Sequence, residues 1–239
     1  MLYPLATLLL LPVLFIQGRY VRSTALRLPE PDGPRRGRDG KGPRLRLLIA
    51  GDSATAGVGV SHQQDALSGQ LVSALATDHE VHWALTATTG YTAGELLQRL
   101  QTEPPETFDA VLLAVGVNDV TGGTGTTAWQ NNLQQLIRLA REKYSARHVF
   151  LCSVPPMHLF PALPQPLRWW LGQRARMLNG QLAALATEDH QCSLVTPDFP
   201  LEHHYMAEDG FHPSADAYKV WGTQAAAIIG AQLSSGKSV

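Results

Sequence analysis

The sequence predicts an α/β protein in which a parallel β-sheet carries helices on both faces. Short apolar segments alternate along the chain with longer segments whose apolar residues recur at helical spacing. The segment at residues 45–50 is short and mostly apolar, as expected of a strand buried on both faces of a parallel sheet. Strands that alternate with helices in this way indicate a parallel sheet, because each helix returns the chain to the edge where the next strand begins.

Each expected element follows from its local pattern. Strands are expected at residues 45–50, 80–86, 108–115, 148–154 and 192–196. Helices are expected at residues 62–78, 93–102, 127–142, 167–187 and 214–233. Thr92 can cap the second helix, and Pro213 suits the start of the last, where its missing N–H costs nothing. The length of 239 residues, without an internal repeat, indicates one folded domain over residues 44–235.

Composition and charge exclude several function classes. A net charge of −1 argues against a nucleic-acid binder, because phosphate binding needs a basic surface. Cys152 and Cys192 both lie in apolar stretches and are expected to be buried small hydrophobes rather than a disulfide or metal pair. The sequence contains no zinc or P-loop motif, so zinc and nucleotide chemistry are not expected, and the adjacent His203 and His204 point apart and are expected to be solvated loop residues.

The N-terminal segment differs from the rest of the chain. Residues 2–16 are apolar apart from Thr7, and arginines follow this run rather than precede it. This order favours an uncleaved membrane anchor over residues 1–18, with the folded domain on the cytoplasmic side; a periplasmic or secreted domain is the alternative. The run is shorter than the ~20 residues that span a bilayer and contains prolines, so it could also lie in the membrane interface. Residues 19–43, rich in Pro, Gly and Arg, are expected to form a flexible linker.

Chemistry-bearing residues follow the predicted strands or lie in a late loop able to reach their ends. They form four short motifs: Gly51-Asp52-Ser53, Gly90, Gly116-Val117-Asn118-Asp119 and Asp209-Gly210-Phe211-His212. The carboxyl ends of parallel strands meet at one edge of the sheet, so these motifs can converge. A serine nucleophile needs a base to take its proton and a carboxylate to hold the base in the correct tautomer. We therefore predict Ser53 as nucleophile, His212 as base and Asp209 as the orienting acid.

Acyl transfer by a serine also needs hydrogen-bond donors aimed at the developing oxyanion. Three candidates are the backbone N–H of Ser53, the backbone N–H of Gly90 and the side-chain amide of Asn118. Gly90 suits this role because a residue without Cβ lets the substrate approach the backbone closely. Asp52 and Asp119 are expected to be structural residues that bond nearby backbone or cap a turn.

These four motifs, in this order and spacing, resemble the SGNH hydrolases, also called the GDSL esterase/lipase family. The resemblance extends over residues 44–233. It implies a flavodoxin-like three-layer α/β/α sandwich with a five-stranded parallel sheet, the triad Ser53, Asp209 and His212, the three oxyanion donors named above, and no cofactor. The rival α/β-hydrolase fold would place Gly-x-Ser-x-Gly at the nucleophile, but Thr55 stands where the second glycine would be.

An apolar, proline-rich segment follows the fourth predicted strand and borders the active-site edge. Its bulky residues could form an acyl-binding wall, or simply cover the core. The candidate wall consists of Met157, Leu159, Phe160, Leu163, Trp169 and Trp170.

The expected function is a membrane-associated serine hydrolase of acyl esters, with a small-molecule or lipid substrate. Lysophospholipid, short-chain or aryl esters and thioesters all fit the predicted machinery. The alternatives are a carbohydrate O-acetyl esterase and, from another class, a membrane-associated binding module without turnover. The complete set of Ser, His, Asp, Gly and Asn argues against the binding module. The sequence does not determine the oligomeric state.

Overall fold

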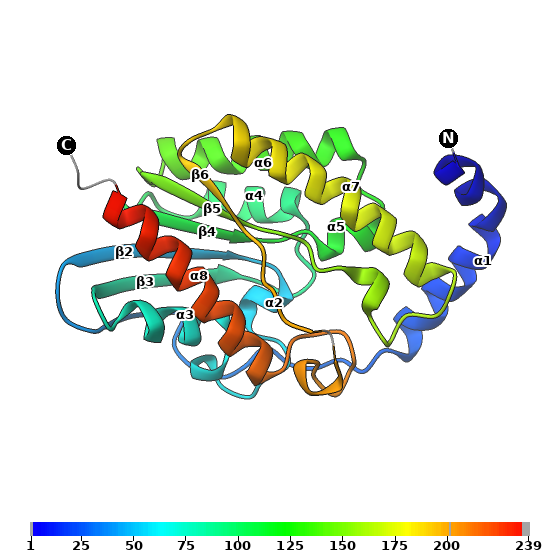
Figure 1. Ribbon diagram of the computed structural model, residues 1–239, viewed down its shortest axis with the longest axis horizontal. Helices are drawn as coiled ribbons and strands as arrows, with labels where there is room; N and C mark the ends of the chain where they lie inside the picture. Colours follow the sequence, from blue (N-terminus) through cyan, green and yellow to red (C-terminus); the bar gives the residue numbers. More distant parts are fainter. Residues whose placement is uncertain (1, 201, 236–239) are drawn as a thin grey trace.

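The computed structural model describes residues 2–200 and 202–235, and it shows a mainly parallel β-sheet flanked by helices (Figure 1). The strands, in their spatial order, are β1 (Arg36–Asp39), β3 (Glu80–Ala87), β2 (Arg44–Gly51), β4 (Ala110–Ala114), β5 (His148–Cys152) and β6 (Cys192–Val195). β2 to β6 are the five predicted strands, and they pair in parallel. β2 therefore lies inside the sheet, with β3 on one side and β4 on the other.

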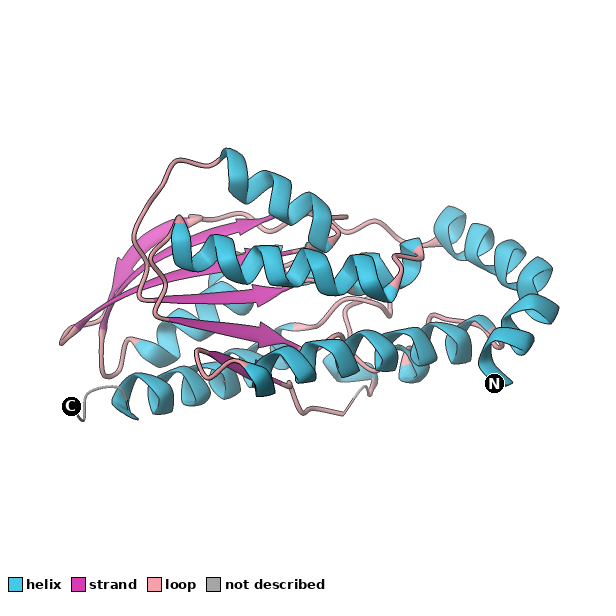
Figure 2. Cartoon of the chain, turned by 90° about the horizontal axis from the view of Figure 1, so that it is seen from above, coloured by secondary structure: helices cyan, strands magenta, loops and turns pink. Residues whose placement is uncertain are grey.

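Helices form a layer on each face of the sheet (Figure 2). One layer contains α2 (Ser53–Ala56), α3 (Leu67–Leu75) and α8 (Ala215–Ser235). The other contains α4 (Ala93–Thr102), α5 (Val117–Gly122), α6 (Thr126–Glu142) and α7 (Leu167–Glu188). Short 3₁₀ helices lie at η1 (Gln63–Asp65), η2 (Met157–Leu159) and η3 (His203–Tyr205). The expected α/β/α sandwich is confirmed.

β2 shows how the two layers are held to the sheet. Successive side chains of a strand point to opposite faces. Leu48 and Ala50 accordingly join the core beneath α4, α6 and α7. Leu45, Leu47 and Ile49 join the core beneath α3 and α8. Both faces of β2 are buried, so its apolar run is explained, and the strand fixes the position of the polar motif that follows it.

The predicted linker contains a strand, so the prediction of a flexible segment is wrong for residues 36–39. β1 pairs antiparallel with the outer edge of β3, from Arg36 opposite Ala84 to Asp39 opposite Val81. All four β1 residues are exposed, and charged residues are common on edge strands because they discourage pairing with another chain. β1 has no apolar alternation for a sequence pattern to detect, and only the available edge of β3 gives it a partner.

The N-terminal apolar run forms α1 (Leu2–Thr24), which extends six residues beyond the predicted anchor boundary at residue 18. One face of α1 packs on the domain. Leu14 is buried in the core beneath α7, and the Gln17 side chain accepts a hydrogen bond from Leu167 N at the start of α7 (3.1 Å). The helix lies beyond the edge at which the parallel strands end (Figure 1).

The other face of α1 is apolar and exposed. Its exposed large side chains are Leu8, Leu9, Leu11, Val13, Phe15, Ile16 and Tyr20. Among the residues described, no helix has both the length and the apolar character that crossing a bilayer requires.

Candidate active site

Ser53 lies where the sequence places it, immediately after β2 and at the first position of α2. Asp52 caps this short helix, with its carboxylate accepting a hydrogen bond from Ala54 N (3.2 Å). Gly51 is required by packing, because a Cβ there would lie 2.0 Å from Ala114 O and 2.1 Å from the Thr55 hydroxyl. The buried strand and the tight turn after it therefore fix the Ser53 side chain at the carboxyl edge of the sheet.

His212 and Asp209 lie beside Ser53 although they are about 160 residues later in the chain. His212 Nε2 lies 2.9 Å from Ser53 Oγ, and His212 Nδ1 lies 2.6 Å from Asp209 Oδ2. The other Asp209 oxygen accepts hydrogen bonds from the backbone N–H groups of Phe211 and His212, both at 2.9 Å. The loop before α8 thus holds the carboxylate rigidly, and the carboxylate holds the imidazole ring.

The pKa values of the two carboxylates near Ser53, Asp209 and Asp52, are shifted in opposite directions. Burial raises the pKa of Asp209, but hydrogen bonds from the His212 ring and from two backbone N–H groups outweigh it, so the pKa lies below its ordinary value. For Asp52, burial dominates over the hydrogen bond from Ala54 and raises the pKa to about 6. Asp209 is therefore ionised at neutral pH and suited to stabilise an imidazolium. Asp52 has the backbone-capping role expected from the sequence.

The loops that carry Gly90 and Asn118 follow the two strands that flank β2. β3 ends at Ala87, opposite Gly51, and β4 ends at Ala114, also opposite Gly51. The Asn118 amide Nδ2 donates to the carbonyl of Tyr91 (3.0 Å), which ties the two loops together.

A second tie joins the same two loops. Asp119 Oδ2 accepts a hydrogen bond from Ala93 N at the start of α4 (2.9 Å). Asp119 is fully buried, and its bond to backbone fits the structural role expected for it. The loop after β2, the loop after β3 and the loop after β4 therefore meet at one edge of the sheet.

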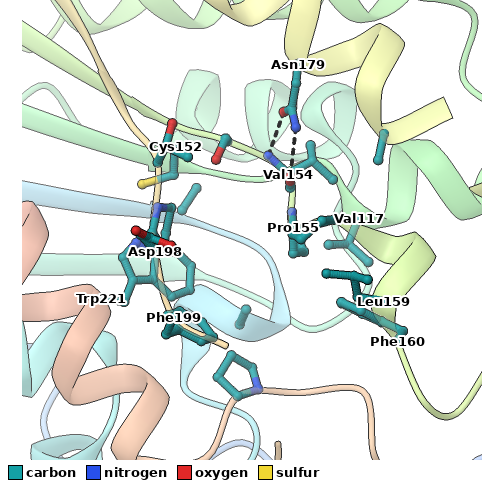
Figure 3. A pocket seen from close by; sticks show the side chains of 18 of the residues that line it. Val117, Cys152, Val154, Pro155, Leu159, Phe160, Asn179, Asp198, Phe199 and Trp221 are labelled. Atoms are coloured by element: carbon teal, nitrogen blue, oxygen red, sulfur yellow. Dashed lines mark hydrogen bonds between the residues drawn. The ribbon is translucent and has the colours of Figure 1, made fainter. Parts of the chain in front are cut away.

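Ser53 and His212 line a cavity of about 700 Å³. Figure 3 shows this cavity with ten of its other lining residues labelled. Two of the six residues predicted to form an apolar wall, Leu159 and Phe160, line it. The remaining lining comes from α2, from the ends of β4, β5 and β6 and the segments that follow them, from α7, from the loop before α8, and from α8 itself. Most of these lining residues are apolar, so the site combines a polar cluster with an adjoining apolar space.

The other four residues of the predicted wall do not line this cavity. Met157 and Leu163 are buried in the core beneath α7. Trp170 Nε1 donates to the Thr7 hydroxyl of α1 (3.0 Å), and the Trp169 ring packs against the Tyr3 ring with centroids 6.1 Å apart. Bulky apolar side chains were used here to fill space and to dock α1, rather than to border an opening.

The sequence prediction missed the residues of α7 that line the cavity. They lie on one face of the helix: Gly172, Ala175, Arg176, Asn179, Gly180 and Ala183. Most of them are small, and their spacing of three or four residues is the signal that could have shown a face without bulky side chains. Met206, Phe199 and Trp221 on the opposite side carried no pattern that linked them to the site.

Within residues 2–200 and 202–235, no group of three or more His, Cys, Asp or Glu side chains is arranged to hold a metal ion. Cys152 and Cys192 are free and buried, as predicted. Burial raises the pKa of the Cys152 thiol to about 12, so this lining residue is neutral.

The fold and the hydrogen-bonded series of Ser53, His212 and Asp209 define an α/β protein of the serine-hydrolase class. The model of the GDSL-like Lipase/Acylhydrolase family matches residues 49–220, a range that includes all three residues. The chain belongs to this family of carboxylic ester hydrolases, and the resemblance read from the sequence is confirmed.

Among curated proteins, the chain is similar to the GDSL-like esterase Rv1075c of Mycobacterium tuberculosis (strain ATCC 25618 / H37Rv). The two are 27% identical over 186 residues, which cover 73% of this chain and 58% of that protein. The chain thus spans less than two thirds of the length of this relative.

Two solved structures illustrate the shared fold. A member of the lipolytic protein G-D-S-L family from Veillonella parvula DSM 2008 matches with a TM-score of 0.62 and 18% identity, over 77% of this chain and 98% of that chain. A carbohydrate esterase family 2 enzyme with a carbohydrate binding domain, from Corynascus thermopiles (Myceliophthora fergusii), matches with a TM-score of 0.65 and 18% identity, over 85% of this chain and 69% of that chain.

Proposed function

We propose that this chain hydrolyses acyl esters through a covalent acyl-enzyme on Ser53. The observation that carries the proposal is the hydrogen-bonded series from Ser53 Oγ through His212 to Asp209, with distances of 2.9 and 2.6 Å, beside a largely apolar cavity. This arrangement supplies the nucleophile, the base and the orienting acid that acyl transfer needs.

The proposed reaction has two halves. Ser53 Oγ attacks the ester carbonyl while His212 Nε2 takes its proton, and His212 then gives that proton to the leaving alcohol as the C–O bond breaks. A water molecule next attacks the acyl-enzyme, with His212 again as base, and the acid is released as Ser53 regains its proton. Asp209, ionised and fixed by backbone donors, keeps Nδ1 protonated and stabilises the imidazolium.

Three donors are proposed to stabilise the tetrahedral oxyanion. Ser53 is the first residue of α2, so its N–H has no acceptor within the helix. Among the described residues, the Gly90 N–H donates to no protein acceptor, and a Cβ at Gly90 would meet nothing within 4 Å. Asn118 uses one amide hydrogen on Tyr91 O, which fixes the side chain and leaves its second hydrogen for the substrate.

The test is an esterase assay of the full chain with p-nitrophenyl acetate, in which we expect turnover that the Ser53→Ala variant lacks. Ser73→Ala, which changes an exposed serine on α3, is the matched control and should retain full activity. A phosphonate ester should label the wild-type protein once and leave Ser53→Ala unlabelled. A correctly folded wild-type protein that neither hydrolyses the ester nor reacts with the phosphonate would contradict the proposal. The full chain is required because a protein starting at residue 44 would lack strand β1.

A carbohydrate O-acetyl esterase remains the second candidate, because the same machinery removes acetyl groups and the similar enzyme from Corynascus thermopiles is named a carbohydrate esterase. A site open to sugars would support it. The apolar lining beside Ser53 favours an acyl group larger than acetyl instead. Comparing acetylated oligosaccharides with aryl esters of longer acids as substrates distinguishes the two candidates. The non-catalytic binding module is disfavoured by the complete hydrogen-bonded series.

We also propose that α1 attaches the chain to a lipid surface, with its apolar side chains in the membrane interface. The exposed positions Leu9, Phe15 and Ile16 support this, since α1 already packs its opposite face on the domain. In sedimentation with anionic phospholipid vesicles, Leu9→Glu should reduce binding and the control Ser23→Glu should not. A cytoplasmic location of the domain stays a prediction from the sequence, and periplasmic activity of a reporter fused after Val239 would overturn it.

A further inference from the structure

The cavity beside Ser53 continues well past the position at which a carbonyl carbon would react. Its lining residues on α7 run from Gly172 to Ala183, a distance of about 16 Å at 1.5 Å per residue. Figure 3 shows Asn179 on one side of this space, Leu159 and Phe160 on a second side, and Phe199 with Trp221 on a third.

Small residues on α7 create this space. At Gly172 the helix approaches η2 so closely that a Cβ would lie 2.4 Å from the His158 Cβ. At Gly180, two turns later, a Cβ would meet nothing within 4 Å. Ala175 and Ala183 extend the same face. The helix is therefore anchored near the catalytic edge and leaves room farther along, where Gly180 and Ala183 line the cavity.

Away from the catalytic cluster, few of the side chains that line the cavity are polar, and these are Cys152, Ser153, Asn179, Thr196, Arg176 and Asp198. Asn179 accepts a hydrogen bond from Val154 N and donates one to Val154 O, both at 2.8 Å, so it is occupied by the end of β5. These two bonds are drawn in Figure 3. The Cys152 thiol is neutral. The charged side chains in the lining that lie farther from Ser53, Arg176 and Asp198, are exposed and belong to the rim.

The opposite side of the cavity is apolar apart from the indole N–H of Trp221. It is formed by Leu194 at the end of β6, by Phe199 in the segment that follows, and by Met206 and Trp221. A cavity of about 700 Å³ is far larger than an acetyl group needs, since a group of water size takes about 30 Å³. A polar sugar in this space would lose hydrogen bonds to water and would find few side chains with which to replace them.

We propose that this space holds the acyl chain of the substrate. The preferred substrates of the protein are then esters of medium-length, unbranched acids. The ester carbonyl lies at Ser53, and the alkyl chain runs along the α7 face toward Ala183. This inference rests on the proposed ester hydrolysis and adds the substrate class. The acyl chain is the occupant because the space is continuous with the Ser53 and His212 side chains, which also line it.

The first experiment measures kcat/KM of the full chain on p-nitrophenyl esters from acetate to dodecanoate. Each methylene buried in the cavity contributes about 0.8 kcal/mol, so kcat/KM should rise by about fourfold per methylene until the space is filled. Hydrolysis of acetate with no rise for longer acids would overturn the acyl-chain assignment and leave ester hydrolysis intact. Failure to hydrolyse any ester, acetate included, would overturn the proposed function itself.

A pair of variants at neighbouring residues then tests where the acyl chain of the substrate lies. Ala183→Trp fills the far end of the cavity, whereas Ala184→Trp places the same side chain on the exposed face of α7. The ratio of kcat/KM for decanoate to that for acetate should fall at least about tenfold in Ala183→Trp and stay at the wild-type value in Ala184→Trp. Equal ratios in both variants would overturn the assignment.

Two further measurements keep the test decisive if the Ala183→Trp variant does not fold, or if it changes the rate of turnover rather than binding of the acyl chain. Gly180→Phe is a second blocking variant, at a position where a Cβ meets no atom. Decanoate binding to the Ser53→Ala variant, followed by calorimetry, reports on the cavity without any reaction. We expect decanoate to bind Ser53→Ala and to bind at least about tenfold more weakly when Ala183→Trp is added. Undetectable decanoate binding in Ser53→Ala would contradict the proposal.

Discussion

The catalytic cluster and the cavity adjoin each other but are built in opposite ways. In the cluster, Ser53, His212 and Asp209 each have named partners at 2.6–2.9 Å, and two backbone donors hold the acid. In the cavity, the α7 face presents glycine and alanine, and the amide of Asn179 is occupied by Val154. Hydrogen bonds thus hold the catalytic residues in place, whereas the small residues of α7 leave space for the substrate. The two regions should respond differently to substitution.

The largest effect is expected for the cluster. Asp209→Asn should lower kcat by about 10⁴-fold, because an amide in place of the carboxylate favours the wrong imidazole tautomer and cannot stabilise the imidazolium. The loss should be the same for acetate and decanoate esters, measured at saturating substrate. A loss that varies with acyl length would show that the cluster and the cavity do not act independently.

Asn118→Ala is expected to have the next largest effect. Removing one oxyanion donor typically costs about 10²–10³-fold in kcat, and here it also removes the bond to Tyr91 that ties two loops together. The reduction should appear in kcat with little change in KM, again for every acyl length. Unchanged kcat would remove Asn118 from the proposed oxyanion site.

Asp52→Asn tests the buried acid beside the cluster through stability. The pKa of Asp52 is raised to about 6 in the folded chain, above its ordinary value of 3.8, so the folded state binds its proton more tightly than the unfolded state. The stability from this group is present below pH 4 and is lost as pH rises through 6, by about 3 kcal/mol. Urea unfolding should show this loss between pH 4 and 7 in the wild type, and a smaller loss in Asp52→Asn. Parallel pH curves for the two proteins would contradict the assignment.

The smallest effect on catalysis is expected for Trp170, which the sequence analysis placed in the substrate wall. Trp170→Ala removes a hydrogen bond to Thr7 and the packing of α1 on α7. We expect a loss of about 2 kcal/mol in the free energy of unfolding, because the side chain is half-buried, and less than twofold change in kcat/KM for any acyl length. A marked change in the preference for acyl length would show that Trp170 contributes to the substrate cavity.

The sequence was informative about strands and motifs because their signals are local. The apolar run at residues 45–50 needs two buried faces, and it forms β2 inside the sheet. The motif after it needs a glycine where Gly51 approaches Ala114, so the turn and the serine can be read together. The family resemblance carried by four such motifs was confirmed over residues 49–220.

Where the sequence analysis was wrong, the deciding partner was distant in the chain. Arg36–Asp39 has no pattern of its own and becomes a strand because β3 offers an unpaired edge. Trp169 and Trp170 appeared to border the site, but α1, more than 160 residues earlier, covers them. Local hydrophobicity identified these side chains as apolar, and it could not distinguish packing against α1 from lining a cavity.

Residue types and their spacing were sufficient to predict the order of strands and helices, the candidate triad of Ser53, His212 and Asp209, and the family. These depend on residue type and spacing, which the chain carries directly. Only the tertiary structure decided that β1 closes the sheet edge, that α1 packs on α7, and that an open space follows the small face of α7 toward Ala183. A cavity is set by atoms that are absent from a volume bounded by several elements, so no single stretch of sequence encodes it.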